Sequence, residues 1–225
     1  IEKMKDKPLS INKIDKKNFV EYAPLLYDLK TLQKDAANRY KISPDTTLKI
    51  AQSLYETHEL ISYPRTDCNV LSEEEAKLIG NSVNLINMFP EYQQYVSKVR
   101  ESNPGHTLNK KYIGELQGHY AIVPVLSYDK SSIPNLNDLE KKIFDLIVKR
   151  LLAALMPPAT GETTEMQGDI TGQPFLAKFK NYKTLGYKGI FKDIEEEEEE
   201  KALSVSYKEG DSVNGKLDEK KDKTK

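Results

Sequence analysis

Apolar residues recur every three or four positions in the middle of the chain, which is the spacing of an amphipathic helix. Four segments keep this period over three turns or more: residues 28–40, 43–58, 72–86 and 137–155. A less regular segment predicts a further helix from Glu91 to Val99. We therefore expect the middle of the chain to be mainly helical.

Helix start signals support these segments. Asp28 and Ser43 can each accept a hydrogen bond from the first turn of the helix that follows, and Pro44 suits the first helical position. Ser72 and Glu75 have the spacing of a capping box, and a pair of prolines stops the longest helix. The second helix is expected to bury one stripe, made of Leu48, Ala51, Leu54, Tyr55 and His58.

Both ends of the chain carry strand patterns. Residues 1–22 alternate apolar and polar side chains, residues 162–191 contain runs rich in Thr, Gly, Phe and Tyr, and residues 203–207 alternate as a half-buried strand does. Two short segments beside the helices, 60–63 and 119–124, also predict strands. The order strand, helices, strands predicts an α+β fold in which the two ends pair while the helical middle forms its own core.

Length and composition set outer limits. A chain of 225 residues can form one or two cores, and its 38% hydrophobic and 31% charged residues fit a soluble globular protein. No apolar run approaches the roughly 20 residues that span a bilayer, so we expect no membrane association. The single cysteine, Cys68, cannot form an internal disulfide, which suits the reducing cytoplasm. The start at Ile1 rather than Met leads us to expect a fragment of a longer protein.

The net charge of −1 argues against a uniformly basic nucleic-acid binder. However, six consecutive glutamates, Glu195 to Glu200, contribute six negative charges, and without them the balance would be +5. We expect this run to be a solvated loop, because consecutive glutamates point in all directions and cannot converge on a metal ion.

Familiar catalytic motifs are missing from the sequence. There is no P-loop, Rossmann glycine pattern, zinc-ligand spacing or nucleophile elbow. The three histidines, His58, His106 and His119, do not have the spacing of metal ligands. His58 lies on the apolar stripe of a predicted helix, so we expect it to pack rather than to catalyse.

One short motif, Tyr63-Pro64-Arg65-Thr66-Asp67, suits phosphoryl chemistry. The proline biases Tyr63 towards extended geometry, and Arg65 can hold a phosphate through paired donors while favouring the phenolate of a nearby tyrosine. Composition alone does not select Tyr63, because the chain has 13 tyrosines. A structural alternative is an exposed strand end where Arg65 and Asp67 form a surface pair.

Taken with His119-Tyr120-Ala121-Ile122-Val123-Pro124, this motif resembles the two signatures of type IA DNA topoisomerases, and most closely those of the bacterial topoisomerase III group. Residues 26–33 are similar to that family's entry into its tyrosine domain, and residues 50–56 to the helix before the active tyrosine. The likeness extends from about Leu25 to Ala159.

The resemblance implies a domain arrangement. Residues 1–24 and 159–225 would be two parts of a discontinuous antiparallel β arch domain, and residues 25–158 a mainly helical, winged-helix-like tyrosine domain inserted between them. In this family the arch moves the tyrosine domain away from its partner, which opens the break for strand passage.

The resemblance also implies site roles. Tyr63 would attack single-stranded DNA and form a 5′-phosphotyrosyl link, Arg65 would hold the scissile phosphate, and His119 would hydrogen-bond that phosphate or assist proton movement. Gln33 and Thr66 would contact DNA or support the site, and Thr66 can also be a simple turn residue.

Some family features differ or are missing. Val125 replaces a common threonine, Gly118 stands where an acidic residue is common, and Cys68 stands where serine is usual. No Asp-x-Asp-x-Glu pattern occurs, so we expect Mg²⁺ to bind outside this fragment in the full-length enzyme. The isolated chain is therefore expected to be inactive.

Two rival hypotheses remain open at this stage. Helices around a short strand also suit a non-catalytic, winged-helix-like module that docks nucleic acid, and an interaction scaffold is a third possibility. Under the leading hypothesis the partner is single-stranded DNA, and we expect a cytoplasmic monomer.

Overall fold

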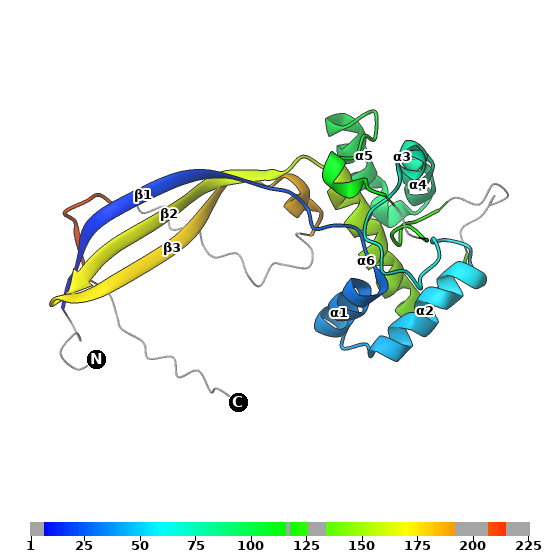
Figure 1. Ribbon diagram of the computed structural model, residues 1–225, viewed down its shortest axis with the longest axis horizontal. Helices are drawn as coiled ribbons and strands as arrows, with labels where there is room; N and C mark the ends of the chain where they lie inside the picture. The colour runs from blue at the N-terminus through cyan, green and yellow to red at the C-terminus, as the bar shows by residue number, and fades with distance from the viewer. Residues whose placement is uncertain (1–6, 116–117, 126–133, 192–206, 215–225) are drawn as a thin grey trace. The chain divides into compact units, whose positions relative to one another are not determined.

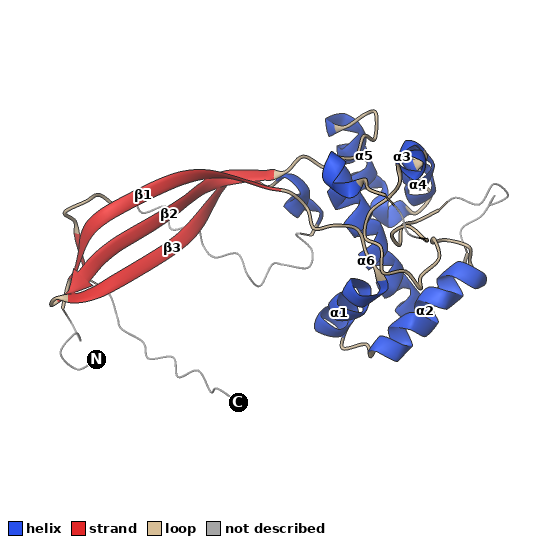
Figure 2. Ribbon diagram, in the orientation of Figure 1, coloured by secondary structure: helices blue, strands red, loops and turns tan. Residues whose placement is uncertain are grey.

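A computed structural model of the chain describes residues 7–115, 118–125, 134–191 and 207–214. It contains helices and an antiparallel sheet, as the sequence pattern predicts (Figure 2). The described residues form two compact units. One unit holds the sheet, with residues 7–20, 160–184 and 207–214, and the other holds the helices, with the described residues of 21–159 and 185–191. The domain ranges implied by the resemblance stay a prediction.

The sheet unit has the strand order β3-β2-β1-β4. The strands are β1 (Leu9–Glu21), β2 (Ala159–Ile170), β3 (Gln173–Thr184) and β4 (Ser212–Val213). β2 and β3 form an antiparallel hairpin closed by Thr171 and Gly172, which both have positive φ as a two-residue hairpin turn requires. β1 lies next to β2, so the first and last segments of the chain share one sheet, as predicted (Figure 1).

Two glycines of β2 let its neighbours approach closely. A Cβ atom at Gly161 would overlap the Asn181 carbonyl, and one at Gly168 would overlap the Ser10 carbonyl. The glycines that mark this part of the sequence are therefore needed for packing within the sheet.

The helical unit is arranged around one long helix. Its helices are α1 (Leu29–Tyr40), α2 (Pro44–Glu56), α3 (Glu73–Lys77), α4 (Ile79–Asn87), α5 (Gln93–Ser102) and α6 (Asp138–Leu155), with short 3₁₀ turns η2 (Pro90–Tyr92), η3 (Lys110–Tyr112) and η4 (Gly186–Ile190). α6 packs against α1, α2, α5 and η4 (Figure 1). Most of its residues are buried, so α6 is the core of this unit.

The predicted helix starts are confirmed. Asp28 and Ser43 accept hydrogen bonds from the first turns of α1 and α2, and Asn137 does the same for α6. Ser72 accepts from the Glu75 N–H at the start of α3, which is the serine half of the predicted capping box. These local signals succeed because each N-cap bond spans only three residues.

The prediction of one continuous helix over residues 72–86 is wrong. The helix ends after Lys77 and a second one starts at Ile79, with Leu78 between them 59% exposed. Ile79, Val83 and Ile86 of the second helix are buried, and Gly80, a poor helix former, lies two residues after Leu78. Tertiary packing therefore divides the predicted helix in two, although the periodic pattern predicts a helix correctly on each side of Leu78.

The predicted stripe on α2 is also partly wrong. The buried residues of α2 are Thr47, Ile50, Ala51 and Leu54. Tyr55 is 38% exposed, and His58 lies beyond the end of the helix. The helix presents this rotated face because it packs against both α1 and α6.

Two short segments, 60–63 and 119–124, were predicted as strands, but neither forms a strand. Each contributes isolated bridges, Ile61 to Pro124 and Ile122 to Tyr27. The backbone hydrogen bonds along these segments are made with several different parts of the chain, so no continuous ladder of strand pairing forms. The predicted loop over 195–200 and all but the last residue of the predicted strand over 203–207 lie outside the described residues.

Glu140 joins the start of α6 to the end of α2. Its carboxylate is buried and accepts hydrogen bonds from the Ser53 hydroxyl at 2.7 Å and the Asn137 N–H at 2.9 Å, and it pairs with His58 Nε2 at 3.1 Å. Burial raises the pKa of this carboxyl, but the bonds from Asn137, Ser53 and His58 outweigh burial and leave the pKa below its ordinary value. His58 therefore has a structural role, but through this polar contact rather than through the packing on the α2 stripe that was predicted.

The lowered pKa makes Glu140 a source of stability at neutral pH. A carboxyl whose pKa falls on folding stabilises the fold above its unfolded pKa, and this contribution disappears as the pH falls through the folded pKa. We expect Glu140→Gln to reduce the free energy of unfolding by about 1–3 kcal/mol at neutral pH. The deficit should shrink below the ordinary pKa of 4.5. Urea unfolding across this pH range measures both effects, with Glu101→Gln on the exposed side of α5 as control. A deficit that does not change with pH would contradict the assignment.

Candidate active site

A sharp chain reversal after α2 places Tyr63. Glu59 has a left-handed backbone with φ of 47°, and the Leu60 N–H donates to the Leu54 carbonyl at 2.9 Å. This folds residues 60–63 back along the last turn of α2. Tyr63 is half-buried, and its hydroxyl makes no hydrogen bond to the part of the chain that the structure describes. The phenol oxygen is therefore available to a ligand.

Ser62 fastens this turn to the second motif, residues 119–125. Its N–H donates to the Val123 carbonyl at 2.9 Å, and its hydroxyl accepts from the Val123 N–H at 3.0 Å and donates to the Ala121 carbonyl at 2.8 Å. The side chain is 5% exposed. One serine thus satisfies three backbone groups of the second motif, next to the tyrosine.

Thr66 makes the corresponding connection on the other side of Tyr63. Its hydroxyl donates to the His119 carbonyl at 2.9 Å and accepts from the Cys68 N–H at 3.0 Å. Its carbonyl accepts from the Leu29 N–H at the start of α1. With only 6% of the residue exposed, the hydroxyl is committed to the fold. Thr66 therefore fixes the backbone of His119.

A buried polar cluster supports the second motif from behind. The Ile122 N–H donates to the Tyr27 carbonyl at 2.7 Å. The Tyr27 hydroxyl donates to Asp35 at 2.7 Å, and Arg150 pairs with Asp35 at 2.5 Å while its guanidinium lies 4.0 Å from the centre of the Tyr27 ring. Burial raises the pKa of Tyr27, so this phenol stays neutral. The cluster connects α1 and α6 to the motif that carries the histidine.

These contacts bring the Tyr63 and His119 rings together. Their centres are 4.3 Å apart and their planes are tilted by 42°. His119 is exposed, so both rings reach the surface from two motifs that are far apart in the sequence. The tyrosine motif and the histidine motif therefore meet through a defined contact between the Tyr63 and His119 rings.

Arg65 lies on the same turn and is exposed. Its guanidinium makes no hydrogen bond or ion pair with the described part of the chain, and Asp67 pairs instead with Lys30 at 3.4 Å. The alternative in which Arg65 and Asp67 form a surface pair is therefore wrong. An exposed guanidinium without a protein partner is suited to hold an anion.

No contact of the Gln33 side chain connects it to the Tyr63 and His119 rings in the described part of the chain. Its side-chain amide donates to the Pro44 carbonyl at 3.1 Å, which joins α1 to the start of α2. The interaction fixes the loop between two helices and leaves the amide oxygen available.

Gly118 explains one departure from the family pattern. The residue has φ of +138°, a conformation that side-chain-bearing residues rarely adopt, and open space surrounds the position of a Cβ atom. An acidic side chain would fit the space but would strain the backbone. The glycine sets the direction in which the chain reaches His119.

Two contributors were missed when only the sequence was considered. Ser62 lay in the predicted strand over residues 60–63, but a serine beside a candidate reactive tyrosine has no distinguishing pattern of its own. Tyr27 lay in a segment similar to the family, yet its buried hydrogen bond to Asp35 depends on α6. A buried serine at an alternating position of a short strand-like segment is the one signal that could have indicated Ser62.

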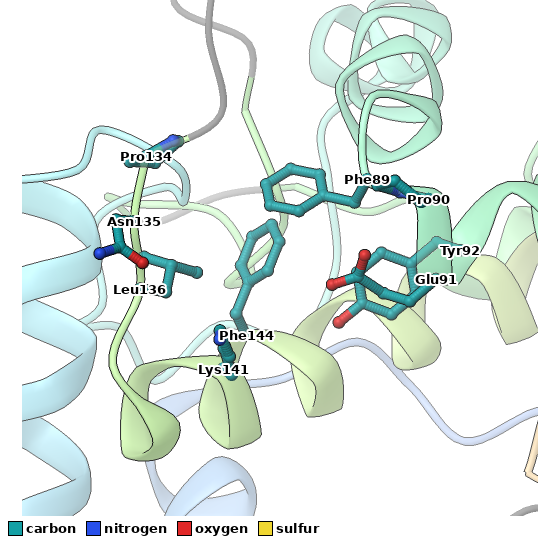
Figure 3. Close-up of a pocket in the computed structure, with 9 residues that line it drawn as sticks. All are labelled: Phe89, Pro90, Glu91, Tyr92, Pro134, Asn135, Leu136, Lys141 and Phe144. Carbon is teal, nitrogen blue, oxygen red and sulfur yellow. The ribbon is translucent and has the colours of Figure 1, made fainter.

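The structure also contains a half-open pocket of about 310 Å³, lined by both apolar and polar residues and separate from the two motifs. Figure 3 shows its lining residues, with the Phe89 and Phe144 rings side by side, their centres 5.1 Å apart. None of its lining residues belongs to either motif.

The described residues hold neither a cluster of metal ligands nor a membrane-spanning helix. Within the described ranges no three His, Cys, Asp or Glu side chains converge as metal ligands do. Among the helices that the structure describes, none combines the length and hydropathy needed to cross a bilayer.

Known proteins resemble the chain over its full length. A family model described as DNA topoisomerase matches residues 1–225. DNA topoisomerase 3 of Bacillus subtilis is 37% identical over 192 residues, which cover 84% of this chain and 25% of that protein. DNA topoisomerase 3 of Bacillus licheniformis is 35% identical over 228 residues, covering 99% of this chain and 31% of that protein. The chain thus spans about a quarter to a third of the length of these relatives.

A solved structure shares the fold. Full-length topoisomerase I from Thermotoga maritima superposes with a TM-score of 0.63 at 23% identity, over 92% of this chain and 33% of that one. The resemblance inferred from the two motifs is therefore confirmed at the level of the family. The chain belongs to the type IA DNA topoisomerase family.

Proposed function

We propose that this chain is the strand-cutting segment of a longer topoisomerase and that Tyr63 is its nucleophile. The ring pair of Tyr63 and His119 carries the proposal, because it joins the two motifs at the surface and leaves the phenol oxygen without a hydrogen-bond partner among the described residues. The Arg65 guanidinium, on the same turn, is equally unoccupied within the described chain. A nucleophile, a group that holds an anion and an imidazole can each assist phosphoryl transfer.

In the proposed reaction the Tyr63 oxygen attacks a phosphodiester of single-stranded DNA. A bond forms between that oxygen and phosphorus, and the bond from phosphorus to the 3′ oxygen breaks. The phenol loses its proton, and the departing oxygen gains one to become a 3′-hydroxyl. One phosphoester replaces another, so religation is the reverse step and requires no ATP.

The other residues receive supporting roles. Arg65 holds the scissile phosphate through paired donors, and His119 hydrogen-bonds that phosphate or moves the proton. We assign Thr66 to support of the site, because both hydrogen bonds of its hydroxyl are made within the fold. Gln33 remains a candidate DNA contact through its amide oxygen.

Mg²⁺ belongs to the proposal for the full-length enzyme, and we place its site outside this chain. The best-held carboxylate here, Glu140, is buried with three hydrogen-bonding partners. The residues that the structure describes do not fit a magnesium site, so no step assigned to this chain passes through the metal.

We also propose the arrangement implied by the family. The helical unit would be a winged-helix-like tyrosine domain spanning residues 25–158, and residues 1–24 and 159–225 would belong to a β arch that moves it during strand passage. Under this proposal the full-length enzyme acts as a cytoplasmic monomer on single-stranded DNA.

The proposal predicts different behaviour for the isolated chain and the full-length enzyme. After incubation with single-stranded DNA and Mg²⁺ and rapid denaturation, the full-length enzyme should carry covalently attached DNA. The isolated chain should carry none and should relax no supercoiled DNA. Robust metal-dependent relaxation by the isolated chain would contradict the placement of the metal site. A salt-sensitive mobility shift without an adduct in the full-length enzyme would instead indicate a non-catalytic binding module, a role that family membership does not favour.

A further inference from the structure

A second aromatic ring contacts Tyr63. The Tyr55 ring meets it edge to face, with centres 5.5 Å apart and planes at 78°. The Tyr63 ring therefore has two aromatic neighbours, His119 from the second motif and Tyr55 from the last turn of α2. The nucleophile lies between two elements that are fixed independently of each other.

Core packing does not account for the position of Tyr55. The buried face of α2 is formed by other residues, and Tyr55 is 38% exposed. Its hydroxyl makes no hydrogen bond to the described part of the chain. Exposing a large aromatic side chain at this position has no benefit for the core, so its ring contact is the feature that needs explanation.

The supporting helix is held firmly. α2 starts with the Ser43 cap and packs against α1 and α6 through its buried residues. The chain reversal at Glu59 then returns Tyr63 to the helix end. Tyr55 is thus presented by a rigid element, whereas Tyr63 lies on a turn whose side chain would otherwise be free to change rotamer.

We propose that Tyr55 is a positioning residue that fixes the Tyr63 ring for attack on phosphorus. In-line attack depends on the direction of the phenol oxygen, and restricting a reacting group to the productive geometry increases its rate. Edge-to-face packing supplies this restriction through the ring alone. Tyr55 needs no hydroxyl for the role, so phenylalanine should replace it.

This inference rests on the proposed function, and its test separates the two. In the full-length enzyme with Mg²⁺, the rate of adduct formation at saturating single-stranded DNA should fall about tenfold in Tyr55→Ala and stay within about twofold in Tyr55→Phe. Tyr55→Leu, which keeps bulk but loses the aromatic edge, should resemble Tyr55→Ala. DNA affinity, measured in a Tyr63→Phe background to prevent cleavage, should change less than about twofold in all three.

Tyr22→Ala serves as the matched control, because Tyr22 is 45% exposed and its ring contact is with the Lys111 ammonium instead. It should react at the wild-type rate. If Tyr55→Ala fails to fold, the comparison of leucine with phenylalanine decides the question.

Two results would overturn the inference alone: wild-type rates in Tyr55→Leu and Tyr55→Ala, or weakened DNA binding with an unchanged saturating rate, which would make Tyr55 a DNA contact. Absence of any adduct in the wild-type enzyme would overturn the proposed function, and this inference with it.

Discussion

Tyr63→Phe is expected to abolish the covalent DNA adduct of the full-length enzyme, lowering its yield at least about a thousandfold. Under the proposed mechanism, the substitution removes the oxygen atom that forms the new bond to phosphorus. It should leave the fold intact, since the Tyr63 hydroxyl makes no hydrogen bond within the described chain and both ring contacts survive in phenylalanine. Quantifying denaturation-resistant protein–DNA complexes, together with a thermal melt, tests both statements.

Tyr120→Phe is the sharp control, because Tyr120 lies in the second motif next to His119. Burial raises the pKa of its phenol, and the neighbouring charges of Glu75 and Tyr55 raise it further, which disfavours the phenolate that would attack phosphorus. This variant should form adducts normally. Adduct that persists in Tyr63→Phe and disappears in Tyr120→Phe would reverse the assignment.

Arg65→Gln is expected to have the second-largest effect, a loss of about 10²–10³ in the rate of adduct formation. The guanidinium can donate two parallel hydrogen bonds to a phosphate whose charge changes during attack, and glutamine lacks the charge. Arg65→Lys should recover only part of the rate, because a single ammonium cannot reproduce the paired donors. Single-turnover cleavage at saturating DNA gives the rates.

Stability should be almost unchanged in both arginine variants, since Arg65 is exposed and unpaired within the described chain. Arg100→Gln is the matched control: Arg100 is also exposed, and it donates to Asn84 in α4. It should cleave DNA at the wild-type rate. An Arg65→Gln enzyme that cleaves normally would remove this residue from the site.

The helices were the most predictable part of the fold. The caps at Asp28, Ser43 and Asn137 are bonds between residues close in sequence, so the pattern contains all the information they need. The break at Leu78 and the partner of His58 were not predictable in this way. They depend on which faces of α4 and α6 become buried, and single-segment periodicity does not specify that.

The residues of the candidate site also differ in whether the sequence alone could predict them. Tyr63, Arg65 and His119 carry functional groups suited to phosphoryl chemistry, and the two motifs were enough to propose them as candidates. Ser62 and Tyr55 carry no distinctive signal, because a buried hydroxyl bridge and an edge-to-face ring contact exist only after distant segments meet. The structure adds the contacts that hold a reactive group in place.

Burial also reduces the number of tyrosines that could act as the nucleophile. Tyr27, Tyr92, Tyr95 and Tyr112 are almost fully buried, and burial raises the pKa of Tyr112 to about 12. None of these four can meet a DNA backbone in this fold. Among tyrosines of the two motifs, only Tyr63 combines partial exposure with a free hydroxyl and a histidine ring beside it.

The most direct test of the account is to identify the attached atom. The full-length enzyme is trapped on single-stranded DNA with Mg²⁺, digested with nuclease and protease, and analysed by mass spectrometry. We predict a nucleotide remnant joined through its 5′ phosphate to Tyr63, with a free 3′-hydroxyl on the released strand. A remnant on any other residue, or one attached through a 3′ phosphate, would contradict the account.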